Sequence, residues 1–236
     1  MLAQFKPEQS GNNNLGSLWI LSVRDDYRMS DPARKASNPE KHRTRRKTQD
    51  NQIRKLIYGI NVTLDGCCDH TKGIGGDDIL EHYTQLLREV DLLVYGRKTY
   101  QLMVPYWPEV AKNPLETKAS IEFARTFDSI NKIVFSRSLD SAEDSNTRIV
   151  PGNLQDEILK LKQESGKNIM AGGVDIPSQL IELGLVDEYR VVVQPIVAGA
   201  GRRLLEDVNL PESLHLKLVE SKVLKSGCVA LRYLKQ

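Results

Sequence analysis

The chain has 236 residues, of which 40% are hydrophobic and 27% charged, and this composition excludes disorder of the whole chain. A formal net charge of +2 gives no overall field that would attract nucleic acid or an anionic membrane surface. The three cysteines are an odd number and two are adjacent, which does not suit a disulfide framework. No apolar run reaches the roughly 20 residues that cross a bilayer. We therefore expect a cytoplasmic protein with neither a membrane nor a nucleic acid as its partner.

Residues 1–52 differ in composition from the rest of the chain. They are rich in Asn, Ser, Arg and Lys and show no periodicity beyond one apolar island at 18–21. The basic run KHRTRRK at 41–47 is open to two interpretations, a nucleic-acid or targeting patch and a solvated tail, and the second is the commoner for such runs. We expect residues 1–52 to be a disordered or poorly packed extension and residues 53–236 to form one domain.

From residue 53 onwards strand patterns alternate with helical patterns, which predicts an α/β layered domain. Asp77 and Asp78 are placed to cap a helix whose apolar residues recur at helical spacing from 79 to 90. Asp175 is the candidate N-cap of a second helix over 177–183. A third helix is expected at 156–163. The predicted strands lie at 55–62, 91–95, 132–135, 168–171, 188–196, 214–223 and 228–234.

Two predicted strands run into glycines that suit a phosphate group. The first is followed by a glycine, two cations and a hydroxyl where a helix can begin, and free amides at a helix start attract an anion. The second is followed by a glycine pair and a helix start, so backbone can approach a ligand without a Cβ in the way. Neither segment has the spacing of a Rossmann or P-loop motif. The first set is Gly96, Arg97, Lys98 and Thr99, and the second is Gly172, Gly173, Val174, Asp175 and Ile176.

A third predicted strand delivers Ser136 and Arg137 at its carboxyl end. The rigid guanidinium fork suits a phosphate monoester such as a ribose 2′-phosphate, which favours NADPH over NADH. Because open α/β sheets bind ligands outside the carboxyl ends of their strands, we expect all three segments to line one cleft.

Five motifs occur in one order along residues 53–236 and carry a family resemblance. They are Thr63-Leu64-Asp65-Gly66, the run GRKTYQLMVPYWPEV at 96–110, Phe135-Ser136-Arg137, Gly172-Gly173, and Leu185-Val186-Asp187-Glu188 with Pro195 and Gly199-Ala200-Gly201 after it. In these motifs the chain resembles the stand-alone dihydrofolate-reductase-like proteins. That family shares its fold with the reductase domain of the bifunctional riboflavin-biosynthesis deaminase-reductase.

The resemblance implies an α/β fold of three layers, with a central mixed, mostly parallel sheet flanked by helices. It also implies NADPH bound over the strand ends, and hydride transfer to a ribosylaminopyrimidine-like or dihydrofolate-like ring. By position, residues 96–99 would bind the diphosphate, Ser136 and Arg137 the 2′-phosphate, and residues 172–176 the ribose and diphosphate on the nicotinamide side. The family's pairing through sheet edges implies a homodimer.

Two aspartates are the candidate catalytic residues. Asp65 would lie near the nicotinamide and the substrate by resemblance. Asp78 is the nearest match to the acidic residue that protonates the pterin in dihydrofolate reductase, although Asp77 competes with it and a helix cap explains both residues. If Asp78 is that acid, partial burial should raise its pKa toward neutrality. If neither aspartate acts, the alternative is a nucleotide-binding or interaction protein without turnover.

Two further groups of side chains leave alternatives open. Tyr106 and Trp107 are candidate substrate-binding residues that would stack on a flat ring, and core packing explains them equally well. The run from Cys67 to His70 contains possible metal ligands, but adjacent cysteines do not easily share one zinc ion and no matching pair follows. We therefore expect no metal site.

Overall fold

The structure is a computed structural model that describes residues 53–206 and 208–236. The predictions made for residues 1–52, including the apolar island and the basic run, lie outside this part of the chain.

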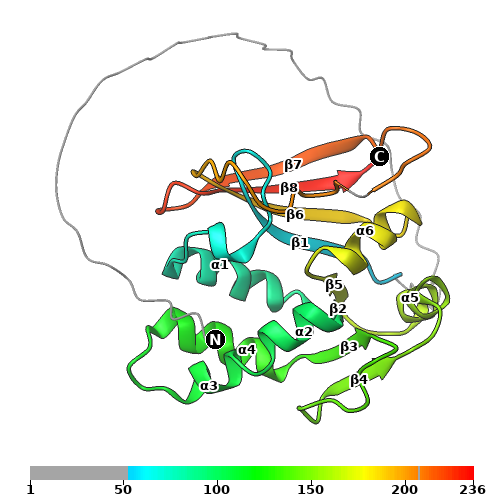
Figure 1. The fold of residues 1–236 in the computed structure, drawn as a ribbon, viewed down its shortest axis with the longest axis horizontal. Coiled ribbons are helices and arrows are strands. Elements are labelled where there is room, and N and C mark those ends of the chain that lie inside the picture. Colours follow the sequence, from blue (N-terminus) through cyan, green and yellow to red (C-terminus); the bar gives the residue numbers. More distant parts are fainter. Residues whose placement is uncertain (1–52, 207) are drawn as a thin grey trace, which may run out of the picture. The chain divides into compact units, whose positions relative to one another are not determined.

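One eight-stranded sheet runs through the described residues, in the order β4-β3-β2-β5-β1-β6-β8-β7 (Figure 1). The neighbouring strands from β4 to β6 are all parallel, and β8 runs antiparallel to both β6 and β7. The predicted mixed, mostly parallel sheet is therefore confirmed. The strands are β1 (Leu56–Thr63), β2 (Val90–Gly96), β3 (Asn131–Phe135), β4 (Thr147–Val150), β5 (Asn168–Ala171), β6 (Glu188–Gln194), β7 (Leu216–Val223) and β8 (Val229–Lys235).

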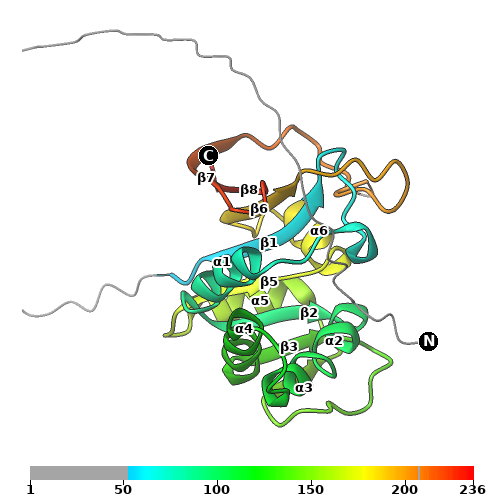
Figure 2. The same ribbon diagram turned by 90° about the vertical axis from the view of Figure 1, so that its left-hand side faces the viewer.

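Helices cover both faces of the sheet (Figures 1 and 2). One buried apolar cluster joins one face of the central strands to α1 (Asp77–Leu87), α2 (Arg97–Met103) and α4 (Lys118–Ser129), with α3 (Trp107–Lys112) at its margin. A second cluster joins the other face to α5 (Leu154–Gln163) and α6 (Asp175–Glu182). Strand alternation explains the division, since Leu56 and Tyr58 of β1 belong to the second cluster and Ile57 to the first. The expected three layers are confirmed.

Two helices and one strand of the described chain, α3, α4 and β4, were not anticipated from the sequence. Helix α4 begins after Thr117, whose hydroxyl accepts a hydrogen bond from the backbone N–H of Ser120, and it buries Phe123 and Phe127. Strand β4 has only four residues at one edge of the sheet, so little sequence pattern marks it. The short 3-10 helix η1 (His70–Lys72) lies in the loop that follows β1. No helix among residues 53–206 and 208–236 is long and apolar enough to cross a bilayer.

Both predicted helix caps are wrong. Gly76 is the N-cap of α1 and makes no side-chain capping bond, so Asp77 and Asp78 lie inside the first turn. Val174 is the N-cap of α6, and Asp175 is the first residue of that helix. Tertiary contacts occupy these carboxylates instead, because Asp77 accepts a hydrogen bond from Thr117 and the other two have partners described below.

Candidate functional site

The carboxyl ends of β2, β3 and β5 lie side by side and enclose a cavity of about 210 Å³. Residues from all three strand ends and from the first turns of α2 and α6 contribute to its wall. The lining residues are Gly96, Arg97, Lys98, Thr99, Phe135, Gly172, Asp175 and Ile176. Two of the three segments expected from the sequence therefore supply most of the wall, and Phe135 connects it to the third.

The glycines of the β5–α6 turn allow the backbone to approach its neighbours. A Cβ at Gly172 would lie 2.7 Å from the ring of Tyr95, and a Cβ at Gly173 would lie 2.2 Å from Oγ1 of Thr99. Gly173 also has a φ of +84°, which L side chains rarely adopt. Its carbonyl accepts a hydrogen bond of 3.0 Å from the hydroxyl of Tyr58. The turn is thus held against the start of α2, and a side chain would force the two apart.

The charges around the cavity suit an anionic ligand. Arg97 and Lys98 are exposed cations in its wall. The one lining carboxylate, on Asp175, forms an ion pair with Arg202, whose Nη1 lies 2.7 Å from Oδ1 of Asp175. The first turn of α6 begins in the same wall at Asp175 and Ile176, and the N-terminal end of a helix favours negative charge. The residues present therefore fit phosphate groups, and a cavity below the roughly 300–1,000 Å³ of a typical ligand pocket would hold part of a dinucleotide.

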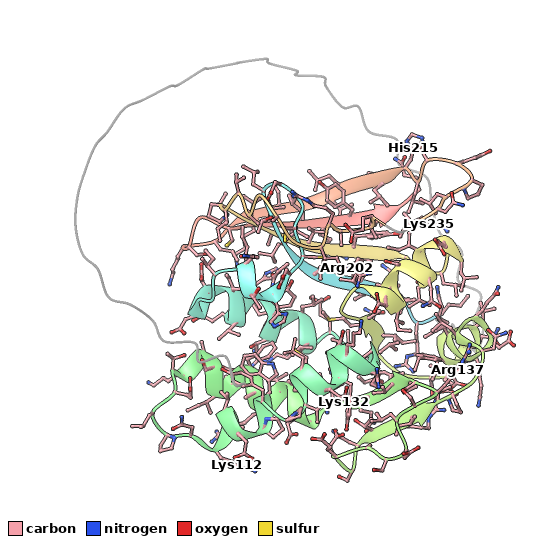
Figure 3. The ribbon with its side chains drawn as sticks, viewed as in Figure 1. Lys112, Lys132, Arg137, Arg202, His215 and Lys235 are labelled. Carbon is pink, nitrogen blue, oxygen red and sulfur yellow. The ribbon has the colours of Figure 1, made fainter. Side chains whose placement is uncertain are left out.

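Ser136 and Arg137 follow Phe135 directly at the end of β3. The hydroxyl of Ser136 accepts hydrogen bonds from the backbone N–H groups of Ser138 and Leu139, so it fixes the turn. Arg137 is exposed beyond the strand (Figure 3). Neither residue lines the cavity itself, but they extend the same sheet edge past Phe135.

Asp65 is held by four groups at once. Its Oδ1 accepts hydrogen bonds from Thr63 and from the backbone N–H of Ala198, at 2.5 and 3.0 Å. Its Oδ2 lies 3.0 Å from the backbone nitrogen of Gly199 and 2.8 Å from Nη1 of Arg203. These bonds, that from Thr63 foremost, hold the pKa of Asp65 well below its usual range. The carboxylate therefore fastens the loop after β1 to the loop after β6.

Asp78 connects α1 to the turn between β7 and β8. Its Oδ2 accepts a hydrogen bond of 2.7 Å from the backbone N–H of Ser226, and its Oδ1 accepts one of 3.0 Å from Ile79. Burial alone would raise the pKa of Asp78, but these hydrogen bonds outweigh burial and the pKa is lowered. The raised pKa expected of a proton-donating acid is thus not what the structure shows.

The structure does not bring Tyr106 and Trp107 to the cavity wall. Trp107 packs edge-to-face on Phe123 of α4, with ring centroids 4.4 Å apart. Tyr106 packs on Trp107 at 5.0 Å and is half exposed. Their position supports the core-packing interpretation, because the aromatic faces are used against α4 and against each other.

Two residues at the cavity were missed at the sequence level. Phe135 lines the wall and stands directly before the Ser-Arg pair, so the strand-end argument could have included it. Arg202 reaches Asp175 from the loop after β6. The signal for Arg202 was available, because two arginines follow the Gly-Ala-Gly run at 199–201.

Comparison with known proteins agrees with this architecture. Residues 54–230 match the family model described as the RibD C-terminal domain. The uncharacterized protein YyaP of Bacillus subtilis (strain 168) is 33% identical over 190 residues, which cover 79% of this chain and 97% of that protein. A putative riboflavin biosynthesis protein from Shewanella sp. PV-4 superposes with a TM-score of 0.60 at 19% identity, covering 77% of this chain and 99% of that one.

A dihydrofolate reductase from Enterococcus faecalis, complexed with NADP(H) and RAB-propyl, has a TM-score of 0.52 at 15% identity. It covers 77% of this chain and 96% of its own, so the two share a fold. The family match spans most of the described residues and includes all three strand ends around the cavity. This chain belongs to the RibD C-terminal domain family.

Proposed function

We propose that this protein is an NADPH-dependent reductase that transfers a hydride to a small heterocyclic substrate, either ribosylaminopyrimidine-like or dihydrofolate-like. One observation carries the proposal. The cavity at the ends of β2, β3 and β5 combines glycines that admit close approach, two exposed cations and a helix start. Family membership supports the reductase class.

The chain's own residues would bind and orient the cofactor, which supplies the hydride. Arg97 and Lys98 would neutralise the diphosphate, and the glycine turn at 172–173 would let its oxygens reach backbone amides. The loop that Asp65 fastens follows β1, so its role would be to shape the substrate side of the site.

Binding and turnover test the proposal separately. Isothermal calorimetry with NADPH is expected to give a dissociation constant in the micromolar range. Loss of absorbance at the reduced-nicotinamide band is then expected with a substrate from a panel of ribosylaminopyrimidines, dihydrofolates and quinonoid pterins. Absence of NADPH binding at several hundred micromolar would rule the proposal out.

A second function is favoured by a specific observation, namely that hydrogen bonds occupy the carboxylates of both candidate catalytic aspartates. A nucleotide-binding or interaction protein that keeps the fold without turnover would need no free acid. NADPH binding combined with no oxidation across the whole panel would select this alternative.

Replacing Arg137 with alanine is expected to weaken NADPH binding about 10- to 100-fold, because a charge-assisted hydrogen bond to the 2′-phosphate is lost. NADH binding should be unchanged, since that cofactor has no 2′-phosphate. Calorimetry with both cofactors measures the difference, and Arg125→Ala, which removes an exposed arginine from α4, is the control. A preference for NADPH that survives in Arg137→Ala would refute the role of Arg137.

We also propose that the protein is a homodimer. Strand β7 is one edge of the sheet and exposes apolar side chains, with Leu218 48% and Val223 73% accessible. An unpaired apolar edge is a surface that a second copy can cover. Sedimentation equilibrium is expected to give twice the chain mass, and a monomer mass at tens of micromolar protein would contradict the proposal.

A further inference from the structure

Two loops beside the cavity are joined into one unit, which we call the paired loops: residues 63–68 after β1 and residues 195–206 after β6. Backbone hydrogen bonds connect Leu64 to Ile196 at 2.8 Å and Cys68 to Arg202 at 2.9 Å. The carboxylate of Asp65 adds bonds to the backbone of residues 198 and 199. Because hydrogen bonds connect the two loops at several points, a displacement of one loop would displace the other as well.

Arg202 links the paired loops to the cavity. Its backbone carbonyl accepts the hydrogen bond from Cys68, while its guanidinium extends to Asp175 at the first turn of α6. Figure 3 shows Arg202 close to that helix. Asp175 is part of the cavity wall, and Arg202 binds the carboxylate of Asp175. This carboxylate is therefore placed between the guanidinium and the space in which a phosphate would lie.

The pair between Arg202 and Asp175 is partly exposed, with 36% and 51% of the two side chains accessible. Such a surface ion pair contributes little to stability. Asp175 would by itself repel an anionic ligand. The guanidinium of Arg202 already faces two carboxylates, that of Asp175 and that of Glu206, whose Oε1 lies 3.8 Å from Nε, and a bound phosphate would be a further anionic partner. Because a guanidinium offers five N–H donors, it can exchange one of these anions for another or bind more than one at a time.

We propose that Arg202 is a cofactor-binding residue that transfers from Asp175 to a phosphate of the bound dinucleotide and draws the paired loops toward the cavity. The inference rests on the proposed function, because the dinucleotide supplies the phosphate. Its consequence is that cofactor binding orders the loop that faces the substrate side. Asp175 then acts as a competitor for Arg202 and not as a support for it.

Paired substitutions separate this role from a structural one. Arg202→Gln is expected to weaken NADPH binding about 10- to 100-fold in calorimetry, because a charge-assisted bond is lost. Asp175→Asn breaks the same ion pair from the other side and is expected to bind NADPH at least as tightly as the unaltered protein. Arg202→Lys should recover part of the affinity, and Arg125→Gln is the control for loss of one positive charge.

Hydrogen exchange gives a second readout. NADPH is expected to slow amide exchange in residues 196–206 of the unaltered protein and of Asp175→Asn, but not of Arg202→Gln. Thermal unfolding verifies that each variant is folded. Equal weakening by Arg202→Gln and Asp175→Asn would assign the pair a structural role and overturn the inference. So would unchanged binding by Arg202→Gln. No NADPH binding by the unaltered protein would instead reject the proposed function, and the inference with it.

Discussion

Replacing Gly173 with alanine is expected to lower the free energy of unfolding by about 2 kcal/mol or more and to weaken NADPH binding at least about tenfold. The residue has a φ of +84°, which costs an L residue about 1–2 kcal/mol. In addition, the new Cβ would lie 2.2 Å from Oγ1 of Thr99, so the β5–α6 turn and the start of α2 must separate. Both segments contribute to the cavity wall, and the groups that would hold the diphosphate therefore lose their spacing.

Gly227→Ala is the matched control for this substitution. Gly227 has nearly the same φ, +83°, but the nearest atom to its added Cβ is Cγ of Pro195 at 3.7 Å, an ordinary contact. It lies in the β7–β8 turn and outside the cavity wall. Denaturant unfolding should therefore show only the conformational cost, and calorimetry should show unchanged NADPH affinity. If Gly173→Ala and Gly227→Ala change the unfolding free energy and the NADPH affinity equally, the close approach of Gly173 to Thr99 is not needed for the cavity to bind the cofactor.

Replacing Glu188 with glutamine is expected to destabilise the fold by about 1.5–3 kcal/mol, because the guanidinium groups of Arg190 and Arg232 lose their buried charged acceptor. Each guanidinium keeps only a more exposed carboxylate, on Glu89 and on Glu220 respectively. The side chain of Glu188 is only 2% accessible. Its Oε1 lies 2.5 Å from Nε of Arg190 and 2.9 Å from Nε of Arg232, and its Oε2 lies 3.1 Å from Nη2 of Arg232. The bonds from Arg232 join β6 to β8, so the loss should appear as a lower midpoint of urea unfolding.

The same carboxylate predicts a pH dependence. Burial alone would raise the pKa of Glu188, but the hydrogen bonds from Arg232 and Arg190 outweigh it and lower the pKa below its ordinary value of 4.5. The unfolded chain therefore binds the proton first as the pH falls, so the stabilisation is complete above pH 4.5 and is lost below it. In Glu188→Gln the free energy of unfolding should therefore decrease less steeply as the pH falls below 4.5.

Glu220→Gln is the control for the Glu188 variant. Glu220 also faces Arg232, but at 3.9 Å and with more than half of its side chain accessible. An exposed pair of this kind contributes less than about 1 kcal/mol. Equal destabilisation by the two glutamine variants would show that burial of Glu188 does not matter to the stability of the sheet.

The sequence predicted those parts of the candidate site that lie at the carboxyl ends of strands. Gly96 and Gly172 each follow a continuous apolar run, and parallel strands bring their carboxyl ends to one edge of the sheet. The order β3-β2-β5 then makes the three segments neighbours. Sequence alone could not give this order, because the pairing depends on crossover connections and not on local pattern.

The local sequence pattern could not predict which side chains contact one another in the folded protein. Asp78 was expected to cap a helix or donate a proton, yet it accepts a hydrogen bond from Ser226, which is 148 residues away in the chain. Trp107 was open to two interpretations, and contact with Phe123 of another helix decided between core packing and a place in the cavity wall. The loop following β6 brings Arg202 to Asp175, a residue of another element 27 positions earlier in the chain.

The sequence by itself determined the layered α/β class, most of the strands and the residue types that suit a phosphate, since alternating burial and glycine turns are local properties. The tertiary structure alone decided which of those residues share a wall and which carboxylates are already occupied. The reason is physical: a hydrogen bond or ion pair depends on the distance between atoms, and sheet topology sets that distance for residues far apart in the chain.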